Sequence, residues 1–127
     1  MVLESEPTSP LLNYQMGFVL QHKQIYDQAQ KHFSLAAYQP NSSVVSYEAL
    51  YQIGRNAVFS QLFIDEGISA LQEYIRQEIS DDLPSIEWAY YRLSQLYKMK
   101  LDVANESIYR TLAAKTNDKD LIEALGM

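Results

Sequence analysis

The sequence predicts an all-α fold, and three observations lead to that prediction. Apolar residues recur at helical spacing along most of the chain, as in Ala29, Phe33 and Ala36. No stretch shows the sustained alternation of apolar and polar residues that marks a β-strand. Two clusters of turn-forming residues, QPNSS at 39–43 and SDDLP at 80–84, separate the helical stretches. The chain therefore consists of predicted helices joined by short turns.

The composition restricts the class of function. A length of 127 residues suits one domain with its own hydrophobic core. The net charge of −6 and the absence of a basic run argue against a nucleic-acid binder, because such proteins neutralise phosphates. No run is apolar and long enough to cross a membrane, and no signal peptide is visible at the start. We therefore expect a soluble, cytoplasmic protein with no membrane partner.

The first two predicted helices follow a polar arm. Residues 1–9 are expected to be flexible, and Ser9 with Pro10 forms the N-cap and first-turn pair that opens a helix. This helix is predicted at 10–24, with apolar residues at positions 12, 16, 19 and 20. A second helix is predicted at 26–38. Residues 10–127 are expected to form a single domain.

Five further helices are predicted, at 43–60, 65–79, 85–99, 102–114 and 117–127. Asp65 and Asp102 are the expected N-caps of the two helices that begin at these residues, because a short acidic side chain satisfies free backbone N–H groups. The last segment is short and is expected to form a capping helix with Leu121, Ile122 and Leu125 inward.

One short pattern recurs in the first helix of each predicted pair. A tyrosine, a polar residue, an aliphatic residue and a small residue follow one another at 14–17, 51–54 and 91–94. The small residues are Gly17, Gly54 and Ser94. A bulky side chain at these positions would force the two helices of a pair apart, so we interpret the pattern as a packing requirement.

The second helices carry a matching set of positions. Ala29, Phe33 and Ala36 correspond to Gly67, Leu71 and Tyr74 in the second pair and to Ala104, Ile108 and Thr111 in the third. Together with the first-helix pattern, this resembles the tetratricopeptide repeat family, a helix–turn–helix unit of about 34 residues. The resemblance implies antiparallel helix pairs stacked as a short right-handed superhelix, an α-solenoid. The repeats would cover about 10–41, 44–80 and 85–115, with 117–127 as a capping segment.

The resemblance also implies where a partner would bind. In this family the position held by Tyr14, Tyr51 and Tyr91 lines a concave groove that accepts peptides or helices of partners. By the same mapping, the predicted partner-binding groove comprises Tyr14, Phe18, Tyr51, Gln52, Arg55, Trp88, Tyr91, Arg92 and Gln95, with Leu11, Gln21 and Glu48 beside them. Tyrosine, tryptophan and arginine are the residue types enriched at binding hot spots.

The groove could also be filled by the chain itself. If the N-terminal arm or the last segment lay in it, Tyr14 and Trp88 would be packing residues. One family subtype is disfavoured: members that bind heat-shock-protein tails clamp a carboxylate with a lysine and an asparagine, where this chain has Tyr14 and Phe18. Arg92 could still hold a carboxylate.

Residues that would indicate catalysis or metal binding are missing. There is no cysteine, no phosphate-binding Gly-Lys-Ser/Thr loop, and no GxSxG or HExxH motif. His22 and His32 lie on different predicted helices, and we expect His32 to be solvated. Asp81 and Asp82 are expected to be loop carboxylates. We therefore expect no enzyme, no cofactor and no metal site.

The expected function is a non-enzymatic protein-interaction module that captures a peptide or helix of a protein partner in its groove. Arg55 and Arg92 would orient acidic groups of that segment. Three alternatives stay open: a self-assembling structural protein that forms a homo-oligomer, a scaffold subunit of a larger complex, and an enzyme on a helical scaffold.

Overall fold

The computed structural model describes residues 9–39 and 44–127, and all regular structure in these residues is helical. The helices are α1 (Pro10–His22), α2 (Tyr26–Ala37), α3 (Val44–Ser60), α4 (Ile64–Ile75), α5 (Ile86–Met99), α6 (Val103–Ala113) and α7 (Lys119–Ala124). The all-α prediction is confirmed for this part of the chain. The predicted flexible arm, apart from Ser9, lies outside the described residues, as do residues 40–43 of the first turn cluster.

Two helix starts follow from polar side chains placed just before them. The Ser9 hydroxyl accepts a hydrogen bond from the backbone N–H of Leu12 at 3.2 Å, and Pro10 occupies the first helical position. Asp102 caps α6 in the same way, through the N–H of Asn105 at 3.1 Å. Both predicted caps are confirmed.

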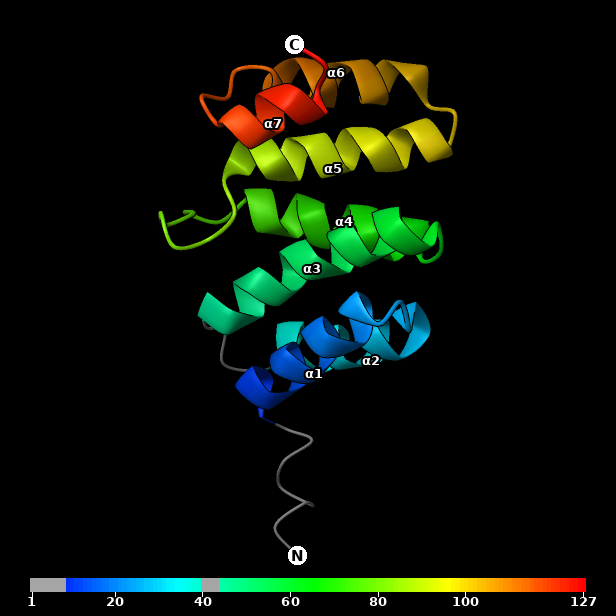
Figure 1. Ribbon diagram of the computed structural model, residues 1–127, viewed down its shortest axis with the longest axis vertical. Helices are drawn as coiled ribbons and strands as arrows, with labels where there is room; N and C mark the ends of the chain where they lie inside the picture. Colours follow the sequence, from blue (N-terminus) through cyan, green and yellow to red (C-terminus); the bar gives the residue numbers. More distant parts are fainter. Residues whose placement is uncertain (1–8, 40–43) are drawn as a thin grey trace, which may run out of the picture.

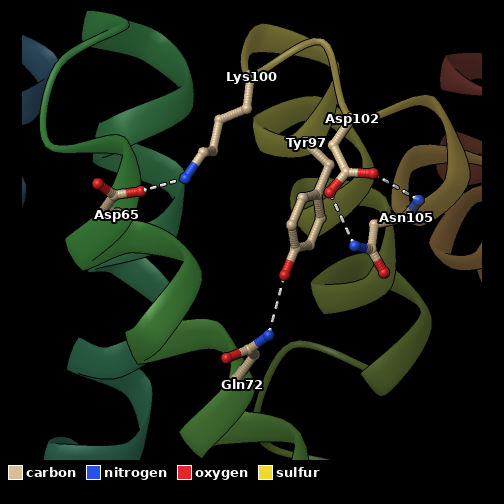
Figure 2. Close-up of polar contacts among 6 residues, drawn as sticks. All are labelled: Asp65, Gln72, Tyr97, Lys100, Asp102 and Asn105. Carbon is tan, nitrogen blue, oxygen red and sulfur yellow. Dashed lines mark hydrogen bonds and ion pairs between the residues drawn. The ribbon is translucent and has the colours of Figure 1, made fainter.

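The predicted cap of α4 is wrong. The helix begins one residue earlier, after Phe63, whose backbone is left-handed (φ 57°, ψ 36°) and whose side chain makes no capping hydrogen bond. Asp65 lies in the first turn instead, where its carboxylate accepts a hydrogen bond from Lys100 Nζ at 2.6 Å (Figure 2). A carboxylate in this turn still suits the helix dipole.

Neighbouring helices pack on one another in chain order (Figure 1). Within pairs, α1 packs on α2, α3 on α4 and α5 on α6, while α2–α3 and α4–α5 contacts join one pair to the next. In addition, α1 touches α3 and α3 touches α5. Helices α1, α3 and α5 therefore form a row of touching helices, and α1 and α7 lie toward opposite ends of the molecule (Figure 1).

Glycines allow the helices of the first two pairs to touch. A Cβ atom added at Gly17 would lie 2.7 Å from the Phe33 ring, and one at Gly54 would overlap the Leu71 side chain. A Cβ atom at Gly67 would lie 2.6 Å from the Cβ atom of Ala57. Interiors packed to this density leave no room for a side chain at these positions, so the predicted close contacts are confirmed there.

The third pair packs in a different register from the predicted one. The predicted inward residues, Ala104, Ile108 and Thr111, are all exposed on α6. The half-buried positions come one residue later, at Asn105, Tyr109 and Leu112. The Tyr109 ring is stacked on Tyr97 of α5, with ring centroids 5.6 Å apart and planes 1° apart. The predicted match required a shorter turn in the third pair, whereas the turns at 23–25, 61–63 and 100–102 are equally long.

Helix α1 buries polar positions rather than its apolar stripe. Met16 and Val19 are 42% and 53% exposed, whereas Asn13, Gly17 and Gln21 are buried. A polar group buried away from water needs a hydrogen-bonding partner. For Gln21 that partner comes from the next pair, so the α1–α3 contact is partly polar.

Polar contacts also join α4 to the third pair (Figure 2). Besides the Asp65–Lys100 ion pair, Gln72 Nε2 donates a hydrogen bond to the Tyr97 hydroxyl at 3.0 Å. The Tyr97 ring is also stacked on the Tyr109 ring of α6. One tyrosine thus contacts both α4 and α6, and it fixes the position of α5 between them.

Helix α7 covers one end of the third pair. Leu121 and Leu125 are buried in a small cluster with Ala113 of α6, against the half-buried rings of Trp88 and Tyr91 of α5. The backbone carbonyl of Leu125 accepts a hydrogen bond from the Arg110 side chain. The prediction of a helix within 117–127 with these two leucines inward is confirmed.

Candidate functional site

An open cleft of about 480 Å³ brings together five of the nine predicted groove residues. They are Tyr51, Gln52 and Arg55 of α3 and Trp88 and Arg92 of α5. The rest of the lining comes from the α4–α5 connection, with Asp81, Leu83, Pro84 and Ser85, and from Asp118 before α7. We name this hollow the arginine cleft.

The two arginines of the cleft donate hydrogen bonds to neutral oxygens. Arg55 Nη1 donates to Gln21 Oε1 at 3.0 Å. Arg92 donates through Nε to the Tyr51 hydroxyl at 3.2 Å and through Nη1 to Gln95 Oε1 at 3.1 Å. Within the described residues, neither guanidinium forms an ion pair with a carboxylate. Asp81 and Asp118 line the same cleft, so within these parts of the chain its two arginines are unpaired although two acidic side chains lie in the hollow with them.

The two positive charges influence each other. Burial, and after it the positive charge of Arg92, lowers the pKa of Arg55. A partly buried charge loses hydration, and a hydrogen-bonded anion offsets that loss. An anionic group bound between Arg55 and Arg92 would also screen their mutual repulsion.

Aromatic rings hold the guanidinium groups in place. The Phe59 ring contacts both of them, with its centroid 4.7 Å from Cζ of Arg55 and 5.4 Å from Cζ of Arg92. Arg92 also lies 5.2 Å from the Trp88 ring and 5.6 Å from the Tyr91 ring. Cation–π contacts of this kind orient a guanidinium and leave its N–H edge available to a ligand.

Phe59 was missed in the sequence analysis although a signal for it exists. It follows Arg55 by one helical turn, as Arg55 follows Tyr51, so the three lie on one stripe of α3. Phe59 is 41% exposed and contacts both arginines, although it is not part of the cleft lining. Asp81 and Asp118 were also missed as cleft residues, because only the packing of the helices brings these two segments together.

Trp88 is both a packing residue and a cleft residue. Its Nε1 donates a hydrogen bond to the Asp118 carboxylate at 3.1 Å. The other oxygen of Asp118 caps α7 through the N–H groups of Asp120 and Leu121. The Trp88 hydrogen bond is the main cause of the lowered pKa of Asp118. The expectation that the last segment could turn Trp88 into a packing residue is therefore met in part.

Tyr51 lines the arginine cleft, but little of its side chain is exposed there. The residue is buried, with 4% of its surface exposed, and its ring lies 5.7 Å from that of Tyr74. Its hydroxyl holds Arg92 in position. Tyr91 and Gln95 contact Arg92 and line a neighbouring hollow of about 470 Å³ against α6 and α7.

The two predicted groove residues of α1 lie outside the arginine cleft. Tyr14 is half-buried between the rings of Phe18 and Phe33, at centroid distances of 6.1 and 6.0 Å. Burial, and after it the negative charge of Glu48, raises the pKa of Tyr14. Phe18 is exposed and lies 4.3 Å from the His22 ring. These side chains form an aromatic edge on α1, the helix that contacts α3.

The described residues contain no group of three or more histidine, aspartate or glutamate side chains placed to hold a metal ion. His32 is not the solvated residue that we expected: it is half-buried, with Nδ1 2.9 Å from Asn13 Oδ1. In the same part of the chain, no helix has the length and hydropathy needed to cross a membrane.

Comparisons with protein-family models, curated proteins and solved structures found no match.

Proposed function

We propose that this chain is a non-enzymatic protein-interaction module that binds a segment of a partner protein along α1, α3 and α5. An acidic group of that segment, either a side chain or a C-terminal carboxylate, would lie in the arginine cleft. The proposal rests on one observation. Arg55 and Arg92 line the same open cleft, and in the described residues they donate hydrogen bonds only to neutral oxygens. Bidentate binding of carboxylates is what guanidinium groups favour.

The order of helix contacts supports the architecture that this proposal needs. Each first helix contacts its own second helix and the first helix of the next pair, while each second helix contacts the next first helix. Stacked repeats with a short superhelical path, as the resemblance to tetratricopeptide repeats implies, produce this order. In such a stack the row α1, α3 and α5 is the concave side, on which all nine proposed groove residues lie.

The proposed partner segment would be extended or helical and partly apolar. Trp88 and Phe59 supply apolar surface beside the arginines, and Phe18 and Tyr14 supply it at the other end of the row. Rigid aromatic side chains give large contact areas at a low cost in conformational entropy. A segment with an acidic residue and one or two large apolar residues is therefore the expected ligand.

A peptide-display selection tests the proposal directly. A random peptide library is selected in parallel on the natural protein, on an Arg55→Gln/Arg92→Gln variant and on an Arg76→Gln/Lys115→Gln control. The control removes two positive charges from exposed positions outside the cleft. All three proteins are first checked for equal helical circular dichroism.

The natural protein and the control should enrich the same peptides, which carry an acidic residue. The cleft variant should bind these peptides at least about ten-fold more weakly in fluorescence anisotropy, because each hydrogen bond to a charged group contributes about 1.5–3 kcal/mol. Peptides that bind the natural protein and the cleft variant equally well would refute a role for the cleft.

Self-assembly is the second candidate, and one observation favours it. The third pair exposes large apolar side chains on α6 and in the turn between α5 and α6, with Leu101 at 86%, Val103 at 73% and Ile108 at 55%. A second copy could cover them. Multi-angle light scattering over a concentration series checks this: a rise in mass that is lost in Ile108→Asp would support the homo-oligomer.

A further inference from the structure

A groove between α2 and α4 lies away from the arginine cleft and shares none of its lining residues. It consists of two adjoining hollows of about 730 and 280 Å³, which share Gln30, Ser34 and Tyr38 of α2. Phe63 lines the larger hollow, and Ile53 of α3 lines the smaller one. We name the two hollows together the α2–α4 groove.

The surface of the groove is apolar at the C-terminal end of α2. Leu35 and Tyr38 are 44% and 56% exposed, and both line the larger hollow. The lining residues of α2 run from one end of the helix to the other, over about 18 Å at 1.5 Å per residue. The large apolar side chains gather at the C-terminal end of α2, while Asp27, Gln30, Lys31 and Ser34 line the rest of it, and exposed apolar groups gathered in this way favour a protein contact.

Phe63 is held at the groove by an unusual backbone conformation. Its φ of 57° is left-handed, a region that residues with a bulky side chain rarely adopt. The residue makes no capping hydrogen bond that would account for this conformation. Gln24 and Leu101, in the other two turns within helix pairs, are left-handed as well, so this conformation is shared by the turns; at Phe63 it places the side chain in the lining of the larger hollow.

The opposite wall, formed by α4, is acidic. Glu66 lines the smaller hollow, and Glu73 follows it on the same helix. Glu73 is close enough to Tyr38 that its negative charge, after burial, raises the pKa of the phenol. Asp65 is paired with Lys100, but Glu66 and Glu73 have no cationic partner in the described residues. Within the described residues, Lys31 of α2 is the only basic side chain that lines the groove.

We propose that the α2–α4 groove is a second interaction surface, which binds a basic amphipathic helix of a partner protein. The apolar side chains of that helix would contact Leu35, Tyr38 and Phe63, and its lysine or arginine residues would face Glu66 and Glu73. Complementary charge selects this occupant over an acidic one, because like charges across an interface are repelled. The surface is independent of the arginine cleft, so the two proposals can fail separately.

The test uses a labelled helical peptide of about 18 residues, in which leucines at helical spacing form one face and lysines form the other. A second peptide carries glutamates in place of the lysines. Both are titrated against the natural protein, a Glu66→Gln/Glu73→Gln wall variant and a Glu78→Gln/Glu123→Gln control. The control loses the same net charge at exposed positions outside the groove.

The natural protein and the control should bind the lysine peptide with equal affinity, whereas the wall variant should bind it about five-fold more weakly. Leu35→Asp should abolish saturable binding, and Arg55→Gln/Arg92→Gln should leave it unchanged. Backbone amide shifts in a two-dimensional NMR spectrum should move in α2 and α4.

Three outcomes would overturn the proposal. The lysine peptide could fail to bind saturably, or the wall variant and the control could lose affinity equally, which would indicate only the overall negative charge. Alternatively, sedimentation could reveal self-association that Leu35→Asp abolishes, which would assign the groove to a second copy of the chain.

Discussion

The first two helix pairs and the third pair meet the same packing requirement with different residues. In the first two, a glycine faces a fully buried apolar side chain, Gly17 with Phe33 and Gly54 with Leu71. In the third pair the small residue is Ser94, and the aromatic contact between the two helices is made by a half-buried tyrosine, Tyr109, stacked on Tyr97.

The pairs also differ in what covers them. The second pair lies between two others, so its side chains are enclosed on both sides. The third pair is covered by the short helix α7 and keeps part of its surface in contact with solvent. A tyrosine suits such a position because its ring packs while its hydroxyl reaches water or a polar partner. The first pair also lies at an end of the row and still packs Gly17 tightly against Phe33, so an end position alone does not relax the packing.

The largest expected effect compares a core position of the first pair with the half-buried aromatic contact of the third. Phe33→Ala should lower the free energy of unfolding by about 3–5 kcal/mol, because it leaves a cavity among fully buried neighbours. Tyr109→Ala should cost about 1–2 kcal/mol, since solvent already reaches that ring. Urea unfolding followed by circular dichroism measures both. Equal costs would mean that the third pair is packed as tightly as the first.

The next effect concerns the small residues of the first helices. Gly54→Ala should destabilise the fold by about 1–3 kcal/mol, because the added methyl group overlaps Leu71. Ser94→Ala should cost at most about 1 kcal/mol, for the loss of the hydroxyl hydrogen bond to the Tyr91 carbonyl at 2.6 Å. Thermal melts of the two variants separate these cases, and a stabilised Gly54→Ala protein would contradict the close contact.

Alkaline pH should destabilise the first two pairs. Burial raises the pKa of Tyr74, whose hydroxyl donates a hydrogen bond to the Pro84 carbonyl at 2.6 Å. The folded protein therefore favours the neutral phenol, so the stabilisation is present below the unfolded pKa of about 10 and is lost as pH rises above it.

The expected loss from Tyr74 is at most about 1.4 kcal/mol per pH unit above pH 10. Urea unfolding at pH 8, 10 and 11 measures it, with Tyr74→Phe as the comparison. That variant is less stable at pH 8, because it lacks the hydroxyl, but its stability should fall less steeply. If the free energy of unfolding fell equally with pH in the natural protein and in Tyr74→Phe, Tyr74 would not be the source of the loss.

The smallest effect tests the register of α6. Ile108→Asp should change the free energy of unfolding by no more than about 0.5 kcal/mol, because the side chain is 55% exposed. Leu112→Asp, on the half-buried side, should cost several times as much. Unfolding curves of both variants check this, and the reverse order would restore the register predicted from the sequence.

Local sequence signals were sufficient for most of the fold. Helical spacing located the helices, and Ser9 and Asp102 marked two of their starts, because these signals act over a few neighbouring residues. The backbone conformations of the turns could not be predicted from the sequence. The turns before α4 and α6 contain Phe63 and Leu101 in left-handed conformations, although neither is a glycine or asparagine. The start of α4 and the register of α6, which depend on these turns, were the parts predicted wrongly, whereas the start of α2 was predicted correctly although Gln24 before it is left-handed too.

The candidate site was predictable only within single helices. Equivalent positions on α3 and α5 supplied Tyr51, Arg55 and Arg92, which do lie in one cleft. The contribution of Asp118 depends on α7 folding back against α5, and that of Gln21 on α1 contacting α3. Contacts between distant segments of this kind leave no local pattern in the sequence.

Trp88 is an intrinsic fluorescence probe of this protein. It is the only tryptophan in the chain, and its indole contacts the Arg92 guanidinium and the Asp118 carboxylate. Its emission should therefore respond both to occupation of the arginine cleft and to detachment of α7. Because the main helix contacts join near neighbours, the C-terminal end can open while α1–α4 stay folded. A fluorescence transition that precedes the loss of helical circular dichroism would record that opening without any added label.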